Sequence, residues 1–317
     1  MSQPKISVAI PVRNEADKIG QCLEAVFSQS LKPHEVIIVD GHSTDGTVEK
    51  VTKFPIKLFY EDAHSESRIG RGRQIGVEKA EGEYIAFTDA DCIPDRNWLE
   101  GLVGEFEQGI VGVGGGMRSV GKGLWERSVN LVFSTFLGSA TSVQGRFFKT
   151  KRFVRSISAC NSMYRREDVL MVGGINADLP GAEDRELNKR LSKLGNLLYT
   201  PKAVVLHQHS WTPTKFVGKV YGYGEQRGMI RIWDLQVVPP LILPFLGLSL
   251  IFTPWFLVAM VGLYLALIES MGIRFAAKER DWRFLFSIPT VYVIEHGLYT
   301  IGFWKGILFS YKTRLNR

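Results

Sequence analysis

The chain has 317 residues, of which 45% are hydrophobic, 22% charged and 11% aromatic. This composition excludes a disordered or collagen-like chain, and the length suggests about two structural units. The three cysteines, Cys22, Cys92 and Cys160, are odd in number and far apart. They exclude a disulfide framework and a CxxC metal motif, and they fit a reducing compartment.

The first third of the sequence alternates strand and helix patterns. Residues 6–11, 35–39 and 84–88 are short β-branched and apolar runs, typical of buried parallel strands. Residues 16–28, 47–53 and 72–80 between them have helical patterns. We therefore predict an α/β fold with a doubly wound, mostly parallel sheet. The N-terminus lacks the pattern of a secretory signal, so we expect residues 1–234 to stay in the cytosol.

Polar residues cluster directly after each predicted strand. The first strand leads into Pro11-Val12-Arg13-Asn14-Glu15, the second into residues 40–46 beginning with Asp40, and the third into Asp89-Ala90-Asp91. Ligands of doubly wound sheets bind at the carboxyl ends of the strands, so we expect the site there. No GxGxxG motif opens a helix and no GxxxxGK[ST] is present, which disfavours a dinucleotide fold and a P-loop.

The formal net charge of +7 is concentrated in one segment. Residues 117–166 hold ten basic residues and one acidic residue, interleaved with large apolar side chains. The positive charge is therefore local and does not indicate nucleic-acid binding. The segment is typical of a surface facing an anionic membrane or a phosphorylated lipid, and the alternative is a basic face over an ordinary core helix.

The last third of the sequence is apolar. Residues 235–268 carry no charge, and as one helix they would span roughly 50 Å, more than a bilayer core of about 30 Å. Either residues 235–268 form one tilted span that overshoots the bilayer, or Pro254 near their middle lets them fold back as a hairpin, which we favour. A second apolar segment follows at 284–309. We predict a membrane-associated helical region over 235–317, in which 284–309 is interfacial, re-entrant or a further span. The alternative is a buried helical hairpin of a soluble protein.

The strand-end motifs resemble those of family 2 glycosyltransferases of the GT-A fold. The resemblance rests on Pro-Val-Arg-Asn-Glu at 11–15, on 39–47, on Gly82 to Asp91, and on Gly181-Ala182-Glu183-Asp184. It covers roughly residues 5–210, and the apolar tail is similar to that of members acting on lipid-linked acceptors. The chain departs from the family pattern at Gly41, where many members have a second aspartate. It also lacks a clear Gln-x-x-Arg-Trp motif, which argues against a processive polymer synthase.

The acidic residues suggest a metal-dependent reaction. Paired carboxylates such as Asp89 and Asp91 suit a hard divalent cation, Mn²⁺ or Mg²⁺, that would bridge the donor diphosphate. The resemblance implies that Asp91 is the direct metal ligand and Asp89 a ribose contact. The alternative is a solvated turn. A late histidine completes the metal shell in related enzymes; His207 is the closer match and His209 the alternative, though a lone histidine is more often structural.

Three further assignments concern catalysis and the donor. Leucines at helical spacing place Asp184 in the first turn of a helix, and the resemblance makes it the general base, with Glu183 contacting acceptor or neighbouring groups. The alternative is a carboxylate that only stabilises the helix. The resemblance also implies that Asp40 accepts from the nucleobase.

The remaining candidates surround the donor. Pro11, Arg13, Asn14 and Glu15 would shape the nucleoside pocket, although Asn14 could equally cap a helix. Two more are Arg73, for phosphate or nucleoside oxygens, with Arg71 as the alternative, and Asn161, for the donor sugar. The alternative for Arg73 is an arginine on the surface of a helix without a ligand, and the alternative for Asn161 is a turn-forming residue.

Together these features predict an integral membrane protein with a cytosolic GT-A domain over 1–234. It would be an inverting, metal-dependent glycosyltransferase that uses a nucleoside-diphosphate sugar and a polyprenyl- or other lipid-linked acceptor, with no nucleic-acid partner. One alternative is a nucleotidyltransferase acting on a sugar phosphate, which usually carries a Gly-rich phosphate loop near the first strand. The other is a non-catalytic, membrane-tethered nucleotide-sugar binder.

Overall fold

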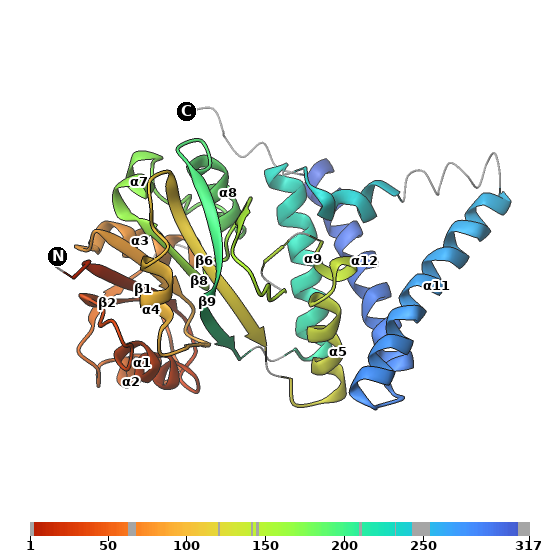
Figure 1. Cartoon of the computed structure of the whole chain (residues 1–317), viewed down its shortest axis with the longest axis horizontal. Helices are drawn as coiled ribbons and strands as arrows, with labels where there is room; N and C mark the ends of the chain where they lie inside the picture. The colour runs from red at the N-terminus through yellow and green to blue at the C-terminus, as the bar shows by residue number, and fades with distance from the viewer. Residues whose placement is uncertain are drawn as a thin grey trace. The chain divides into compact units, whose positions relative to one another are not determined.

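The computed structural model describes residues 3–62, 68–119, 121–140, 142–143, 146–208, 211–231, 233–242 and 254–309 (Figure 1). The chain divides into two compact units. The α/β unit comprises Met1–Ser119 and Ser142–His209, and the helical unit comprises Val120–Thr141 and Ser210–Arg317. The helical unit therefore includes part of the basic segment and begins its second stretch before residue 235, where the sequence becomes uncharged.

The α/β unit is built on one mixed sheet. Its strands are β1 (Ile6–Val12), β2 (Glu35–Asp40), β3 (Lys57–Tyr60), β4 (Tyr84–Thr88), β5 (Cys92–Pro94), β6 (Ile110–Ser119), β7 (Arg152–Val154), β8 (Asn161–Arg165) and β9 (Asn196–His207). The order is β3-β2-β1-β4-β8-β6-β9-β5, and β7 also pairs with β9. Strands β1, β2, β3 and β4 pair with one another in parallel, and β6 pairs with β9 in parallel. Strand β8 is antiparallel to its neighbours β4 and β6.

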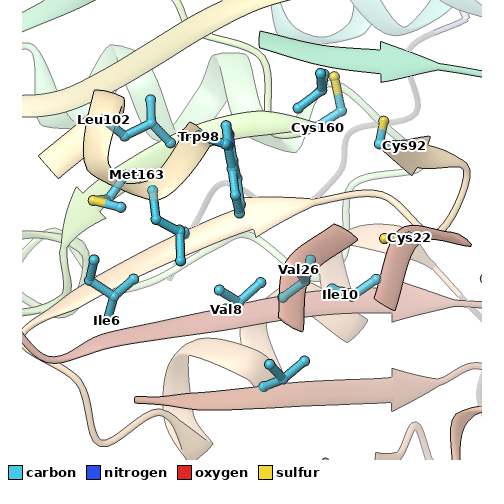
Figure 2. Packing of buried hydrophobic residues seen from close by; sticks show 14 of the residues in the cluster. Ile6, Val8, Ile10, Cys22, Val26, Cys92, Trp98, Leu102, Cys160 and Met163 are labelled. Atoms are coloured by element: carbon cyan, nitrogen blue, oxygen red, sulfur yellow. The ribbon is translucent and has the colours of Figure 1, made fainter. Parts of the chain in front are cut away.

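Helices cover both faces of this sheet. They are α1 (Ile19–Phe27), α2 (Thr47–Val51), α3 (Ile69–Lys79), α4 (Trp98–Val103), α7 (Arg166–Met171) and α8 (Glu183–Leu191). Val8 and Ile10 of β1 share a core with Val26 of α1 and Trp98 of α4 (Figure 2), whereas Ala9, between them, packs with α3, α7 and α8. Because both faces are buried, β1 is apolar throughout. The predicted doubly wound α/β fold is confirmed.

Strand register brings the predicted polar clusters to one edge of the sheet. Val12, the last residue of β1, pairs with Asp40, the last residue of β2. Strand β4 is parallel to β1, with Ala9 opposite Phe87, so Asp89 and Asp91 follow at the same edge. The carboxyl ends of these parallel strands therefore carry the polar clusters together, as the sequence predicted.

The helical unit contains α5 (Leu124–Phe133), α6 (Phe136–Ser139), α9 (Pro213–Ile230), the 3₁₀ turn Leu235–Val237, α11 (Pro254–Glu279) and α12 (Phe284–Leu308). Its core joins Val129 and Val132 of α5 to Phe216 of α9, Phe275 of α11 and Tyr292 of α12. The apolar side chains of the basic segment are thus partly core residues of this unit. The prediction that they form a surface for lipid does not hold for Val129 and Val132.

Helices α9 and α12 pack through glycines on both partners. A Cβ added at Gly224 or Gly228 of α9 would lie 2.0 Å from the Tyr299 carbonyl oxygen or 2.3 Å from that of Phe303. On α12, Gly302 and Gly306 approach α9 backbone oxygens equally closely. Both pairs have the Gly-x-x-x-Gly spacing that lets helix backbones approach in membranes.

Helices α11 and α12 are long and apolar enough to cross a membrane, over Trp255–Glu279 and Phe284–Leu308. The predicted segment 284–309 coincides with α12. The hairpin expected over 235–268 differs from the structure. Pro254 is the first residue of α11, and this helix continues past Ile268 into charged residues for which the sequence predicts a linker. Proline is favoured at a first helical position because its missing N–H needs no partner there. Residues 243–253 of that predicted hairpin, and the basic tail, lie outside the described residues.

Candidate functional site

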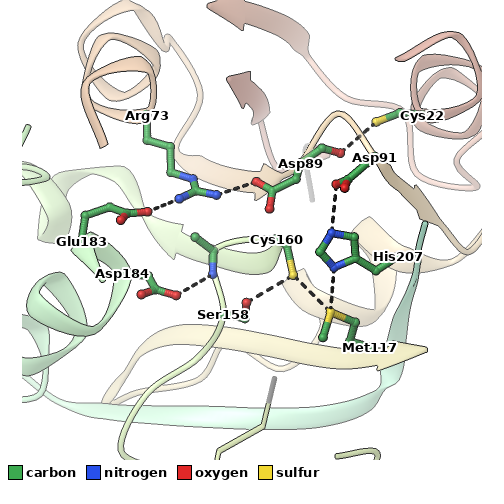
Figure 3. Close-up of polar contacts among 11 residues, drawn as sticks. Cys22, Arg73, Asp89, Asp91, Met117, Ser158, Cys160, Glu183, Asp184 and His207 are labelled. Carbon is green, nitrogen blue, oxygen red and sulfur yellow. Dashed lines mark hydrogen bonds and ion pairs between the residues drawn. The ribbon is translucent and has the colours of Figure 1, made fainter. Parts of the chain in front are cut away.

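The two aspartates after β4 lie at the centre of a polar cluster (Figure 3). The Asp89 side chain contacts the guanidinium of Arg73, which also contacts Glu183. Arg73 comes from α3 and Glu183 is the first residue of α8, so this chain of contacts joins three elements of the α/β unit. Arg73 and Glu183 are both buried. A buried arginine between two carboxylates compensates charges that would be costly alone.

This arrangement changes the expected role of Arg73. Its two terminal nitrogens bind carboxylates of the protein, whereas the sequence suggested a phosphate or nucleoside contact. Burial raises the pKa of the Glu183 carboxyl, and the charge of Arg73 opposes that shift. The arginine therefore fixes the positions of Asp89 and Glu183.

Asp91 contacts the predicted histidine ligand. Strand β5 pairs with the end of β9 so that Cys92 lies opposite His207, and this brings His207 beside Asp91. The His207 Nε2 lies 2.9 Å from the Asp91 Oδ1. Burial acts to lower the pKa of His207, but the hydrogen bond to Asp91 and the neighbouring Cys160 raise it to about 10. On the other side, the Lys18 Nζ lies 3.9 Å from the Asp91 Oδ2.

The donor atoms of Asp89, Asp91, Cys92 and His207 all lie within 4.8 Å of one another. Two carboxylates and an imidazole are suitable ligands for Mn²⁺ or Mg²⁺, which favour oxygen and accept nitrogen. The donor set therefore fits a divalent cation. The structure brings the three predicted metal ligands together, and His209, the alternative ligand, lies outside the described residues.

Asp184 is the second residue of α8, next to Glu183. Its Oδ2 accepts a hydrogen bond of 3.4 Å from the Ala159 backbone N–H, and its Oδ1 one of 2.7 Å from Arg185 N–H. The helix begins after Ala182, whose φ is 58°. As predicted, the carboxylate lies in a first helical turn, where the helix dipole stabilises negative charge.

A second group of polar residues lies at the ends of β1 and β2. Asp40 is 1% exposed; its Oδ2 accepts a 3.0 Å hydrogen bond from Ser43 N–H, and its Oδ1 is buried with no hydrogen-bond partner among the described residues. Asn14, with φ 53°, receives a 2.8 Å hydrogen bond from Thr44 N–H on its Oδ1. Buried polar atoms in proteins normally have hydrogen-bond partners, so this Asp40 oxygen marks a place where a ligand or a water molecule would complete the bonding.

The other predicted nucleoside residues surround this group. Pro11 is buried, and a Cβ on Gly72 of α3 would lie 3.0 Å from its Cβ. Arg13 is exposed. Glu15 forms a 3.0 Å ion pair with Lys18, the lysine that also approaches Asp91. Lys18 therefore links the β1 cluster to the aspartates after β4.

Asn161 differs from its expected role as a sugar contact. It is 1% exposed, and its Oδ1 accepts a 2.7 Å hydrogen bond from the Trp98 indole. Its Nδ2 donates to the carbonyls of Gly116 and Ala203, at 2.8 and 3.2 Å. The side chain thus ties β8 to β6, β9 and α4, where β6 has a register shift after Gly115. We assign Asn161 a structural role.

Sulfur atoms, which sequence reasoning did not include, lie beside the cluster. The Cys160 Sγ is 3.6 Å from the Met117 Sδ, which lies 3.1 Å from the His207 Nδ1. Contact with the Cys92 thiol, and with His207, lowers the pKa of Cys160 to about 6, while burial raises that of Cys92. Only the pairing of β5, β6, β8 and β9 brings these residues together, so no local motif could have indicated them.

The chain is similar in sequence to known proteins. A family model described as "Glycosyl transferase family 2" matches residues 7–170. A Methanococcus voltae protein named dolichyl N-acetyl-alpha-D-glucosaminyl phosphate 3-beta-D-2,3-diacetamido-2,3-dideoxy-beta-D-glucuronosyltransferase is 26% identical, over 96% of this chain and 97% of that protein. Glycosyltransferase AglE of Haloferax volcanii is 30% identical over 74% of this chain and 75% of its own.

Solved structures share the fold. The mannosyltransferase PcManGT from Pyrobaculum calidifontis, in complex with GDP-Man and Mn²⁺, aligns with a TM-score of 0.64 and 17% identity, covering 95% of this chain and 88% of that one. S. aureus TarS 1–349 in complex with UDP aligns with a TM-score of 0.50 and 18% identity, covering 95% and 90%. These likenesses place the chain among proteins with a GT-A fold.

Proposed function

Because the chain belongs to glycosyl transferase family 2, it is a glycosyltransferase, and we propose that it transfers a sugar from a nucleoside-diphosphate donor to a lipid-linked acceptor with inversion at the anomeric carbon. The observation that carries the proposal is the continuous set of contacts in the α/β unit. It joins Asp89 through Arg73 to Glu183, and Glu183 is followed directly by Asp184.

We assign Asp91, Asp89 and His207 to a divalent cation, Mn²⁺ or Mg²⁺. Bound there, the cation would supply positive charge that holds the donor diphosphate and stabilises it as a leaving group. The protein's own contribution is to hold the ligands in place. Arg73 fixes Asp89, the pairing of β5 with β9 fixes His207, and the Lys18 ammonium adds positive charge beside Asp91.

Asp184 is the proposed general base. In an inverting transfer, one carboxylate takes the proton of the acceptor hydroxyl as that hydroxyl attacks the anomeric carbon from the face opposite the diphosphate. Asp184 lies in the first turn of α8, where the helix dipole favours a negative charge and so favours the carboxylate form that a base requires. Glu183, held by Arg73, is a positioning residue that fixes the start of α8.

The nucleoside is assigned to the ends of β1 and β2. The buried, unpaired Oδ1 of Asp40 is the proposed acceptor for an N–H of the base, since a buried carboxylate oxygen gains most from such a bond. Pro11, Asn14 and Glu15 form the surrounding wall, and Arg13, which is exposed, is assigned to the outer part of the pocket.

The acceptor proposal rests on the helical unit and on the relatives. Helix α11 exposes large apolar side chains, among them Trp255, Val258 and Leu263, which a bilayer would cover. The Methanococcus voltae relative carries a dolichyl phosphate sugar in its name.

The test uses the purified full-length protein in liposomes that contain a polyprenyl-phosphate-linked sugar. A panel of nucleoside-diphosphate sugars is supplied with Mn²⁺, with Mg²⁺ or with a chelator, and released nucleotide and lipid product are measured. We expect release of nucleoside diphosphate and a lipid heavier by one sugar, both dependent on the cation, with inverted anomeric configuration by NMR. A parallel reaction with a nucleoside triphosphate and a sugar 1-phosphate tests the alternative, because release of pyrophosphate there would indicate nucleotidyl transfer. No turnover of any nucleoside-diphosphate sugar would contradict the proposal.

A further inference from the structure

A sulfur-rich pocket lies beside the carboxylates in the α/β unit. The thiols of Cys92 and Cys160 and a ring nitrogen of His207 all lie within 4.8 Å of one another, and all three residues are buried. Cys92 begins β5, Cys160 directly precedes β8 and His207 ends β9. Figure 3 shows Asp91 and Met117 on opposite sides of the His207 ring, with the Cys160 sulfur next to Met117.

Met117 of β6 adds a fourth soft donor to this pocket. Its thioether sulfur lies 3.1 Å from the His207 Nδ1 and 3.6 Å from the Cys160 Sγ. Strand pairing explains the position, since Met117 lies opposite Val205 of β9, two residues before His207. The pocket therefore offers two thiols, an imidazole nitrogen and a thioether from four separate segments.

The two nitrogens of the His207 ring contact different kinds of side-chain group, a carboxylate and a thioether. The Nε2 faces the Asp91 carboxylate at 2.9 Å, and the Nδ1 faces the Met117 sulfur. We propose that Cys92, Cys160, His207 and Met117 form a second cation site, which takes a thiophilic divalent cation such as Zn²⁺ or Cd²⁺ and shares the His207 ring with the carboxylate site.

The ligand chemistry separates the two sites. Thiolate and thioether sulfur select Zn²⁺ and related soft cations, whereas Mn²⁺ and Mg²⁺ favour the oxygens of Asp89 and Asp91. Each thiol that binds the cation releases its proton to solvent, as metal ligation by cysteine requires. The carboxylate side of the His207 ring is the more exposed one, since the Asp91 side chain is 18% exposed whereas Cys92 and Cys160 are buried.

Occupancy of the sulfur site has a consequence that rests on the proposed function. A cation bound to the His207 Nδ1 leaves the proton on Nε2, which then donates to Asp91. His207 is in that state unable to ligate a cation on the carboxylate side. Thiophilic cations therefore inhibit Mn²⁺-supported transfer by removing one ligand.

The direct test is a Cd²⁺ titration of the reduced full-length protein, without donor or acceptor, that follows the ultraviolet charge-transfer band of cadmium thiolate. The matched control is Cys22→Ser, because Cys22 is also buried but its thiol donates to the Asp89 carbonyl at 3.5 Å and is outside the group. We expect a band saturating at one Cd²⁺ per chain in the wild type and in Cys22→Ser. It is lost in Cys92→Ser and in Cys160→Ser.

No band in the wild type, or a band that persists in both Cys92→Ser and Cys160→Ser, would overturn the site. Should those variants fail to fold, X-ray absorption of the Zn²⁺-loaded wild type decides: sulfur scatterers at about 2.3 Å are expected, and a shell of oxygen and nitrogen alone contradicts the proposal. Both measurements are independent of transfer. If both measurements show no sulfur-bound cation, the sulfur site is refuted and the proposed glycosyl transfer is unaffected. If the Cd²⁺ band appears but the protein transfers no sugar, the proposed function is refuted and the sulfur site is retained.

Discussion

The two units of the chain differ in the side chains that they expose and in the contacts that join their elements. In the α/β unit, charged side chains are buried at strand ends and paired with one another, as Arg73 is with Asp89 and Glu183. In the helical unit, glycines join α9 to α12, and large apolar side chains of α11 such as Trp255 remain 83% exposed. Internal ion pairs offset the cost of burying charge in the first unit, whereas the second unit exposes apolar side chains that a bilayer would cover.

The largest expected effect is on chemistry in the α/β unit. Asp184→Asn removes the proposed base, so we expect kcat for nucleotide release to fall about 10²- to 10⁴-fold with donor affinity retained. Glu186→Gln is the control, because Glu186 lies on the same helix but pairs with Arg190. Steady-state kinetics and calorimetric donor binding measure the two quantities. Unchanged kcat in Asp184→Asn would remove the base assignment.

The second prediction concerns the stability of the same unit. Arg73→Gln leaves Asp89 and Glu183 without their cation, and breaking a buried ion pair in this way costs about 3–5 kcal/mol. Arg73→Lys keeps the charge but loses the planar fork, so we expect an intermediate loss. Thermal unfolding measures both. If Arg73→Gln were as stable as the wild type, the arginine would not hold the cluster together.

Nucleotide affinity should change next. Asp40→Asn replaces the buried, unpaired carboxylate oxygen, and loss of a charged hydrogen bond is expected to weaken nucleoside-diphosphate binding about 10- to 100-fold. Asp17→Asn, at an exposed position nearby, serves as the control. Calorimetric titration measures nucleoside-diphosphate affinity in the two variants. Equal affinities in Asp40→Asn and Asp17→Asn would show that the nucleobase binds elsewhere.

The smallest effect tests the helical unit through two neighbouring glycines of α9. Gly224→Ala forces a Cβ against the Tyr299 carbonyl and should destabilise by about 1–3 kcal/mol, since the packing leaves no space. A Cβ at Gly222 meets nothing within 4 Å, so Gly222→Ala should stabilise by up to about 1 kcal/mol through helix propensity. Unfolding in detergent measures the difference, and equal effects would refute close packing of α9 on α12.

The sequence predicted the parts of the site that lie within short motifs. Asp40 ends β2, and Asp89 and Asp91 lie just after β4. Parallel strands end at one edge, so the grouping of these residues could be expected. The sulfur pocket could not be, because Cys92, Met117 and Cys160 meet only through strand register. The internal bonds of Asn161 depend on the same register.

The helical region was harder to delimit. An uncharged run marks apolar surroundings but does not mark where a helix begins. Pro254 is compatible with a turn and with a first helical residue, and the structure has the second. The apolar residues of α5 likewise fit a membrane surface or a core, and only packing against α9 and α12 decides between them.

Pulsed electron paramagnetic resonance of Mn²⁺ bound to the full-length protein with a nucleoside diphosphate tests the central claim most directly. We expect phosphorus coupling from the diphosphate and nitrogen coupling from an imidazole in the wild type, with the nitrogen coupling lost in His207→Ala and both lost in Asp91→Asn. Mn²⁺ bound to the wild-type complex without phosphorus or nitrogen coupling would contradict a cation held by Asp91 and His207 against the diphosphate.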